Sequence, residues 1–231
     1  MSEQPIFTLR HAAVVLGRVS ALSELNMAIA QGERVALVGA NGSGKSTLLR
    51  LLHGLIVPTQ GIVQRDATVR QAFVFQRPFV MRTSVQRNVA LAAWLQGAPW
   101  RVAHVQATQA LQDAGLQALM HRPARTLSGG QQQLLALARA MVTQPQCLLL
   151  DEPTANLSPQ AKREVETTMQ RAVHNGMSLV FASHNLGQVK RLASRVVCLD
   201  AGRIVADCSV EDFFTKPLPE AAARFVQGES L

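Results

Sequence analysis

The chain lacks tyrosine altogether, and aromatic residues make up only 4% of its 231 residues. Acidic residues are scarce as well: 15 Asp and Glu stand against 23 Lys and Arg, which gives a formal net charge of +8. A basic excess of this size indicates an anionic partner, such as nucleic acid, lipid headgroups or an acidic protein surface. Between residues 67 and 126 the single acid Asp113 accompanies seven arginines, namely Arg70, Arg77, Arg82, Arg87, Arg101, Arg122 and Arg125. Because few aromatic residues lie among these arginines, the segment does not predict a surface on which nucleic-acid bases stack. It is either a solvated face or a docking surface.

Long apolar runs are also lacking. The longest, such as residues 35–38 and 148–150, fall far short of the ~20 residues that a membrane helix needs. Residues 1–10 do not show the basic start, apolar stretch and cleavage site of a signal peptide. We therefore expect a cytoplasmic chain that reaches a membrane only through a partner.

The three cysteines, Cys147, Cys198 and Cys208, have neither the spacing of a metal site nor that of a CxxC pair. We expect them to be small apolar residues in a reducing compartment.

The elements predicted from the pattern alternate between strands and helices. Strands are expected near residues 6–10 and 14–16 and at 33–39, 72–75, 147–150 and 178–182, with a hairpin over 196–209 that turns at Ala201 and Gly202. Helices are expected at 45–55, 129–142 and 159–175, and over 84–120 with a break at Pro99. This alternation predicts an α/β fold around a mainly parallel sheet, with a helical stretch inserted in its middle.

The strongest motif is a glycine-rich loop between a predicted strand and a predicted helix. It comprises Gly39, Ala40, Asn41, Gly42, Ser43, Gly44, Lys45, Ser46 and Thr47, and it satisfies the pattern G-x-x-x-x-G-K-[ST]. Glycines let the backbone wrap so that its N–H groups point at phosphate oxygens, and the helix that follows adds its dipole. Lys45 would neutralise the outer phosphates and Ser46 would ligate Mg²⁺. A chance glycine-rich turn is the alternative, and the strand and helix on either side argue against it.

A pair of acids follows the buried run 148–150. Asp151 would lie at the carboxyl edge of the sheet, where it can hold Mg²⁺ through water. Glu152 would lie near the terminal phosphate and polarise an attacking water. Two adjacent acids at a strand end are often only a solvated turn, but the phosphate loop in the same chain favours the catalytic reading.

The third motif, Leu127, Ser128, Gly129, Gly130 and Gln131, opens a predicted helix. It reads either as a helix cap or as a second anion-binding turn. With the phosphate loop and the acid pair, it resembles the nucleotide-binding subunit of ABC transporters, whose signature sequence is LSGGQ. The resemblance spans about residues 6–217, and the motifs occur in the family's order.

The resemblance implies an ABC-type P-loop NTPase fold. In this fold a mainly parallel core sheet carries an antiparallel β subdomain and an inserted helical subdomain. We expect one domain over residues 1–231, in which 1–76 and 143–231 form the catalytic core and β subdomain. Residues 77–142 would form the helical subdomain with the signature.

The resemblance also implies a site shared by two copies of the chain. Two ATP molecules would lie between the phosphate loop of one copy and Ser128, Gly129, Gly130 and Gln131 of the other. Gln76 matches the residue that touches Mg²⁺ and water, and His184 matches the switch histidine on the terminal phosphate. Without the resemblance, the simpler interpretation of Gln76 would be an ordinary polar residue at a strand end, and that of His184 a structural histidine.

Several positions depart from the family's pattern. Leu16 stands where an aromatic residue usually stacks on adenine, so we expect weaker base selection and comparable affinities for ATP and GTP. Ser158 and Asn185 stand where the family usually has acids, and Leu134 stands where it usually has an arginine, so we expect an effect on coupling across the interface more than on nucleotide binding.

The expected function is that of the ATPase subunit of an importer. It would bind ATP and Mg²⁺ and act with separate permease subunits at the cytoplasmic face of the inner membrane, with a solute-binding protein as an indirect partner. Residues 77–85 and 186–192 resemble the matching stretches of oxyanion importers, especially tungstate and less closely phosphate systems. Importers of amino acids or metal ions remain alternatives.

Two other classes of protein fit the sequence less well. A soluble ABC-type ATPase acting on nucleic acid or ribosomes usually has two cassettes or long coiled-coil insertions, which this sequence lacks. A P-loop kinase or GTPase would leave residues 128–131 and His184 without a role. Nucleic acid is therefore not the expected partner.

Overall fold

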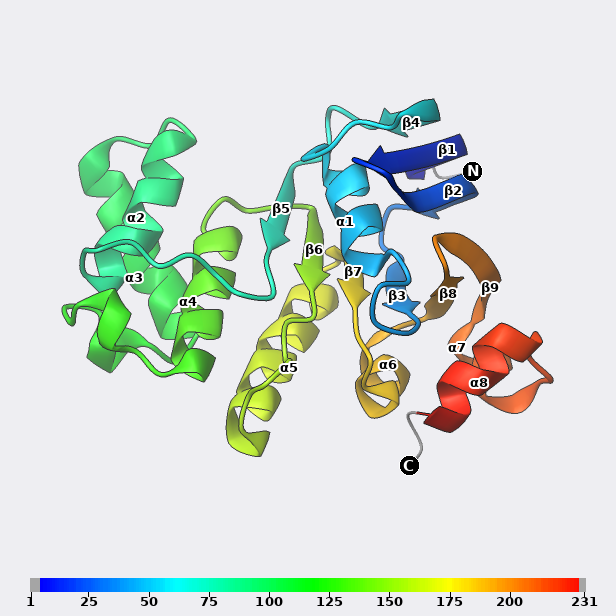
Figure 1. Ribbon diagram of the computed structural model, residues 1–231. Coiled ribbons are helices and arrows are strands. Elements are labelled where there is room, and N and C mark those ends of the chain that lie inside the picture. Colours follow the sequence, from blue (N-terminus) through cyan, green and yellow to red (C-terminus); the bar gives the residue numbers. More distant parts are fainter. Residues whose placement is uncertain (1–4, 229–231) are drawn as a thin grey trace.

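The computed structural model describes residues 5–228. Its N-terminal part is a three-stranded antiparallel sheet in the order β2-β1-β4 (Figure 1). The strands are β1 (Pro5–Leu16), β2 (Val19–Ala30) and β4 (Gln60–Arg65). This sheet is the antiparallel β subdomain that was predicted.

The second sheet has six strands in the order β5-β6-β7-β3-β8-β9. Five of them run parallel, and only β9 pairs antiparallel with β8. The strands are β3 (Arg34–Val38), β5 (Gln71–Val74), β6 (Cys147–Asp151), β7 (Ser178–Ala182), β8 (Arg195–Asp200) and β9 (Arg203–Ser209). Every residue of β6 and β7 is buried, as expected for a parallel sheet covered on both faces.

Helix α1 (Lys45–His53) lies between the two sheets (Figure 1). Its apolar side chains Leu48, Leu49, Leu51 and Leu52 are all buried in the core shared with the N-terminal sheet. Helix α1 is terminated by Gly54, whose backbone adopts the left-handed conformation. The Arg65 side chain of β4 donates hydrogen bonds to the carbonyl oxygens of Leu51 and Leu52 in the last turn of the helix. These contacts fix the helix, and with it the loop that precedes it.

Three helices form a separate group at the left of Figure 1: α2 (Val85–Leu95), α3 (Trp100–Asp113) and α4 (Gly129–Met141). Pro99 caps the start of α3, so the predicted break within 84–120 is confirmed. Pro99 precedes the first helical residue with an extended backbone, and its missing N–H costs no helical hydrogen bond there. This group is the predicted helical subdomain, and its limits of 77–142 stay a prediction.

The remaining helices are α5 (Pro159–His174), α6 (Leu186–Leu192), α7 (Val210–Thr215) and α8 (Glu220–Gly228). The sequence pattern did not reveal β2, β4 or α6 to α8. In β2 a bulge at Glu24, whose φ is +54°, shifts the buried positions from Leu22 to Leu25 and breaks the alternation. Strand β4 is an edge strand without a buried residue, so it has no alternation to read.

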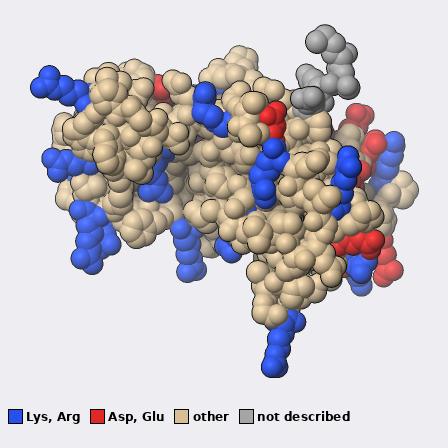
Figure 2. Space-filling model, turned by 90° about the horizontal axis from the view of Figure 1, so that it is seen from above, with Lys and Arg blue, Asp and Glu red and all other residues tan. Residues whose placement is uncertain are grey.

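Charge is spread unevenly over the surface. Seen from above, basic side chains project around the helical group at the left, and acidic side chains gather toward the opposite end (Figure 2). Within residues 5–228 no helix is both long and apolar enough to cross a membrane.

Candidate functional site

The glycine-rich loop leaves β3 and enters α1 at Lys45. Gly39 has a φ of +137°, and a Cβ there would collide with the carbonyl oxygen of Leu199 in the adjacent strand β8. Gly44 has a φ of +109°, and a Cβ there would lie 2.9 Å from the carbonyl oxygen of Ala21. Both positions therefore require glycine. The packing that requires them also fixes the path of the loop at the helix N-terminus, where anions bind.

Lys45 is buried inside the loop. Its Nζ donates to the carbonyl oxygens of Gly39 at 2.7 Å and Ala40 at 3.0 Å. The ammonium group is thus held against the backbone of the loop, in the motif position whose lysine contacts the outer phosphates. Ser43 is also buried, and within residues 5–228 its hydroxyl has no hydrogen-bond partner. A phosphate oxygen bound in the loop would supply one.

Ser46 and Asp151 meet beneath the loop. The Ser46 hydroxyl donates to Oδ1 of Asp151 at 2.7 Å, and Asp151 is the last residue of β6. Burial raises the pKa of Asp151, and the hydrogen bond from Ser46 opposes that shift. The two side chains bring a hydroxyl and a carboxylate together, which is an oxygen set of the kind that Mg²⁺ prefers.

Glu152 joins two other predicted residues. Its Oε2 accepts from Nε2 of Gln76 at 3.3 Å and lies 3.3 Å from Nδ1 of His184. Glu152 has a φ of +45°, a conformation that is strained for a side chain of this kind. Gln76, Glu152 and His184 follow the neighbouring strands β5, β6 and β7, whose carboxyl ends meet at one edge of the sheet. The structure therefore brings together three residues that the sequence predicted one at a time.

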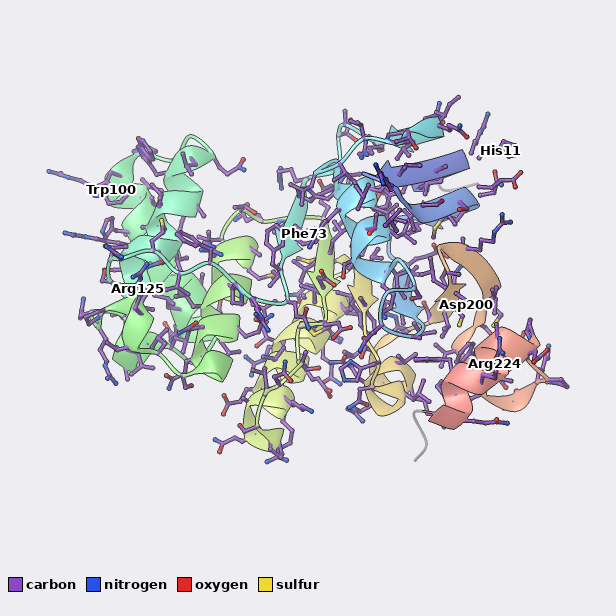
Figure 3. All side chains as sticks on the ribbon, in the orientation of Figure 1. His11, Phe73, Trp100, Arg125, Asp200 and Arg224 are labelled. Atoms are coloured by element: carbon purple, nitrogen blue, oxygen red, sulfur yellow. The ribbon has the colours of Figure 1, made fainter. Side chains whose placement is uncertain are left out.

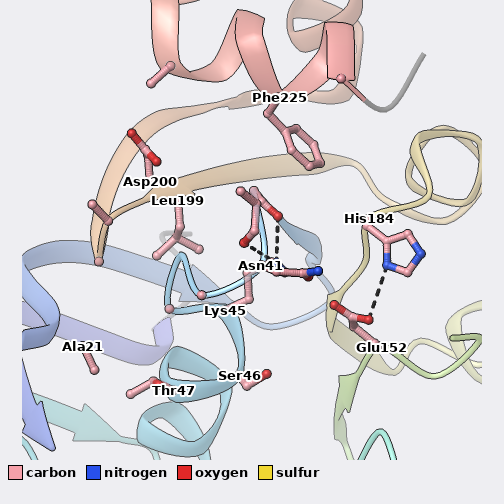
Figure 4. Close-up of a pocket in the computed structure, with 18 of the residues that line it drawn as sticks. Ala21, Asn41, Lys45, Ser46, Thr47, Glu152, His184, Leu199, Asp200 and Phe225 are labelled. Atoms are coloured by element: carbon pink, nitrogen blue, oxygen red, sulfur yellow. Dashed lines mark hydrogen bonds and ion pairs between the residues drawn. The ribbon is translucent and has the colours of Figure 1, made fainter. Parts of the chain in front are cut away.

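A cavity of about 1060 Å³ connects the loop with this cluster (Figure 4). The predicted residues that border it are Gly39, Asn41, Gly42, Gly44, Lys45, Ser46, Thr47, Gln76, Glu152 and His184. The cavity is large enough for a nucleotide, since small-molecule sites usually measure about 300–1,000 Å³.

Besides Ala155 and Asn156 in the loop after Glu152, three segments from other parts of the chain border the cavity and were not predicted. They are residues 19–21 at the start of β2, the turn 200–202 between β8 and β9, and one face of α8. On α8 this face comprises Ala221, Arg224, Phe225 and Gly228. In Figure 4 the Phe225 ring points from α8 toward Asn41 of the loop. Figure 3 shows Arg224 and Asp200 at the same end of the molecule. The spacing of the α8 residues indicates a helical face, but no local pattern tells what that face covers.

Leu16 does not border the cavity. It lies half-exposed at the end of β1, and Val19, across the turn, borders the cavity instead. The adenine contact predicted for Leu16 stays a prediction.

The signature residues 128–131 lie elsewhere, at the start of α4. Ser128 and Gln131 form a capping box: the Ser128 hydroxyl accepts from the Gln131 amide, and the Gln131 side chain accepts from the Ser128 amide. Gly130 packs so closely against α5 that a Cβ would lie 2.5 Å from the Cβ of Ala161. None of the four residues 128–131 borders the cavity that Lys45 and Glu152 share.

The positions that depart from the family's pattern have local roles. Ser158 caps α5 by accepting from the amide of Ala161, and Asn185 caps α6 by accepting from the amide of Gln188 at 3.0 Å. Leu134 is buried in the core that the helical group shares with the six-stranded sheet. Ser158 and Asn185 thus stabilise the starts of their helices, and the effect of these three residues on coupling across the interface stays a prediction.

Comparisons with known proteins agree with this geometry. The family model for ABC transporters matches residues 22–155. The nickel import ATP-binding protein NikO of Rhodobacter capsulatus is 35% identical over 97% of both chains. The phosphate import ATP-binding protein PstB 2 of Natronomonas pharaonis is 33% identical, with 90% of this chain and 81% of that protein covered. The structure of cbiO1 from Clostridium perfringens, part of the ABC transporter complex cbiONQ, superposes with a TM-score of 0.82 at 26% identity over 97% of this chain and 95% of that one. The chain therefore belongs to the ABC transporter family, as one of its ATP-binding ATPase chains.

Proposed function

We propose that the chain is the ATP-hydrolysing subunit of an importer for a small solute. It would drive transport through separate membrane subunits while lying against the cytoplasmic face of the inner membrane. The observation that carries this proposal is the cavity that the phosphate loop shares with Glu152 and His184. The relatives named above, which are import ATP-binding proteins for nickel and phosphate, support the direction of transport.

Residues in and directly beside the cavity fit Mg²⁺ as the companion of ATP. Ser46 and Asp151 present two oxygens 2.7 Å apart, and Gln76 lies next to Glu152 in the same cluster. When bound there, Mg²⁺ neutralises charge on the phosphates. Within residues 5–228 no three His, Cys, Asp or Glu side chains gather as a metal site, so Ser46, Gln76 and the phosphates would complete the coordination.

The cavity residues also fit hydrolysis by in-line attack of water on the terminal phosphate. Lys45 holds the outer phosphates and offsets the charge that develops on them. Glu152 polarises the attacking water and accepts its proton, and His184 contacts the terminal phosphate. The contact between Glu152 and His184 supports this assignment, because both side chains must reach the same phosphate.

A second copy of the chain would complete each site. Ser128, Gly129, Gly130 and Gln131 lie outside the cavity, so in this proposal they bind the ATP held by the partner copy. Each pair of chains then encloses two ATP molecules.

For the transported solute we propose an oxyanion such as tungstate, delivered to the membrane subunits by a solute-binding protein. The supports are the likeness of residues 77–85 and 186–192 to oxyanion importers and the similarity to a phosphate importer's ATPase. The NikO relative is named as a nickel import protein, so a metal ion is the main alternative to an oxyanion as the transported solute.

Two experiments test the proposal. In the first, tagged chain is recovered from detergent-solubilised membranes. A polytopic partner is the expected companion, and recovery of RNA or DNA instead would contradict an import function. Replacing the exposed Arg82 and Arg87 with Glu should release this partner if the basic helical group forms the docking face. Arg203→Glu, an equally exposed change on β9, is the matched control and should leave the partner bound.

In the second experiment the purified complex is placed in lipid vesicles with its binding protein. ATP hydrolysis is then measured with tungstate, phosphate, Ni²⁺, methionine or glutamine. Stimulation by tungstate or phosphate would support the oxyanion assignment. Stimulation by Ni²⁺ or an amino acid alone would contradict it while leaving the ATPase assignment intact.

A further inference from the structure

The loops that carry Glu152 and His184 are joined by a buried chain of hydrogen bonds. Gln188 lies in its middle and is fully buried. Its Oε1 accepts from the Ser183 hydroxyl at 2.7 Å, and its Nε2 donates to the Thr154 hydroxyl at 3.1 Å. Ser183 and Thr154 are themselves buried, so water does not compete for these groups.

Each end of this chain lies beside a residue of the proposed chemistry. Ser183 directly precedes His184, and Thr154 follows Glu152 by two positions in a turn closed by the Ala155 amide and the Glu152 carbonyl. Gln188 also contacts the residue that follows His184, because the Gln188 backbone amide donates to the side chain of Asn185. The Asn185 amide in turn donates to the Ser183 hydroxyl at 3.0 Å.

We propose that Gln188 is a positioning residue for ATP hydrolysis: it fixes the loop of His184 at a set distance from the loop of Glu152. The proposal rests on the roles proposed above for those two residues. One planar amide supplies both the acceptor and the donor, so the two loops cannot separate unless buried polar atoms lose their partners. A shift of about 1 Å between reacting groups can lower a rate by about 10²-fold.

The main test replaces Gln188 with Met, which has similar length and no hydrogen bonds. It is made in the full chain purified with its membrane partner. We expect kcat to fall about tenfold or more, while the Kd for ATP changes less than about twofold, because Gln188 does not border the nucleotide cavity. A kcat within twofold of the unmodified protein would overturn the proposal.

Gln188→Glu separates positioning from simple stability. Both of its oxygens can accept, and the Ser183 and Thr154 hydroxyls can each turn to donate, so the link between the loops is kept. We therefore expect it to restore most of the rate that Gln188→Met loses. If burial alone mattered, the charged side chain would be at least as harmful as Met, and an equal loss in both variants would contradict positioning.

A matched pair of variants uses two serines that flank the buried part of β7: Ser178, its first residue, and Ser183, which directly follows its last residue. Ser183→Ala removes a hydroxyl of the chain of hydrogen bonds, and Ser178→Ala removes an equally buried hydroxyl that accepts from the Gly32 amide at 2.8 Å. Only Ser183→Ala should lower kcat, and equal losses would speak against the proposal. Should Gln188→Met fail to fold, Thr154→Val tests the same link by removing one hydrogen bond, and an unchanged kcat there would likewise overturn it.

Glu152→Gln, measured in parallel, tells which assignment fails. If that variant still hydrolyses ATP, the proposed role of Glu152 is wrong. If it does not, and Gln188→Met is normal, only the positioning role is wrong.

Discussion

Replacing Glu152 with Gln should stop ATP hydrolysis and leave ATP binding intact. The two side chains have the same shape, and Gln at this position can still accept from Nε2 of Gln76, as Glu152 does now at 3.3 Å. The positive φ of +45° strains both residues alike, so the fold should not change. What disappears is the negative charge and the base that accepts a proton from water.

The size of the effect follows from that loss. A positioned general base contributes about 10²–10⁴ to a rate, which is about 2.7–5.4 kcal/mol of activation free energy at 1.36 kcal/mol per tenfold change. Binding should change little, because Lys45 and the glycines of the loop provide most of the contact with the phosphates. The variant should therefore trap ATP and accumulate as the dimer with ATP bound.

The assay measures phosphate release at saturating ATP and Mg²⁺, together with ATP affinity and the elution volume with and without ATP. Glu164→Gln, on the exposed face of α5 and outside the cavity, is the matched control and should keep kcat within about twofold. If Glu152→Gln retains a third or more of the normal rate, Glu152 is not the base. If ATP affinity is lost along with the rate, the loss does not come from the chemical step.

Two further predictions concern the rest of the fold. Burial raises the pKa of Cys147 and Cys198 to about 12, so at pH 8 only on the order of 10⁻⁴ of either thiol is ionised. Iodoacetamide should therefore label the half-buried Cys208 first in the native protein. Mass spectrometry measures the labelling, and equally fast reaction of Cys147 or Cys198 would contradict the prediction. Arg195 forms an ion pair with Asp207 through two hydrogen bonds, of 2.6 and 2.7 Å, and this contact raises the pKa of Arg195. Arg195→Met should lower the free energy of unfolding, measured in urea titrations, by about 2 kcal/mol. Adding Asp207→Asn should recover part of the lost stability, whereas no recovery would show that the lost packing of the arginine stem matters more.

The sequence predicted the parts of the site that depend on neighbours in the chain. Gly39, Gly44, Lys45 and Ser46 belong to one continuous segment, and a strand and a helix must flank it for the motif to work. Both flanking elements could be predicted from short apolar patterns, and the structure confirms them as β3 and α1. The helices α4 and α5 were predicted for the same reason, because their apolar spacing and their caps are local.

Elements with little local pattern were missed. Strand β4 is exposed at a sheet edge, and β2 contains a bulge that shifts its buried positions. Helix α6 spans only seven residues, too few to show a clear helical period. In each case the element exists because neighbouring elements pair with it or pack on it, which single-sequence propensity does not reveal.

The sequence by itself determined that this protein has a phosphate-binding loop, because the loop's geometry depends on glycines and on a lysine within one short segment. Only the tertiary structure decided how the rest of the site comes together. Gln76, Glu152 and His184 lie far apart in the chain, and they meet because β5, β6 and β7 lie side by side in the sheet. The buried link through Gln188 and the wall formed by α8 arise in the same way, from the packing of distant segments. No local preference encodes such contacts, since they depend on which surfaces remain to be buried once the sheet has formed.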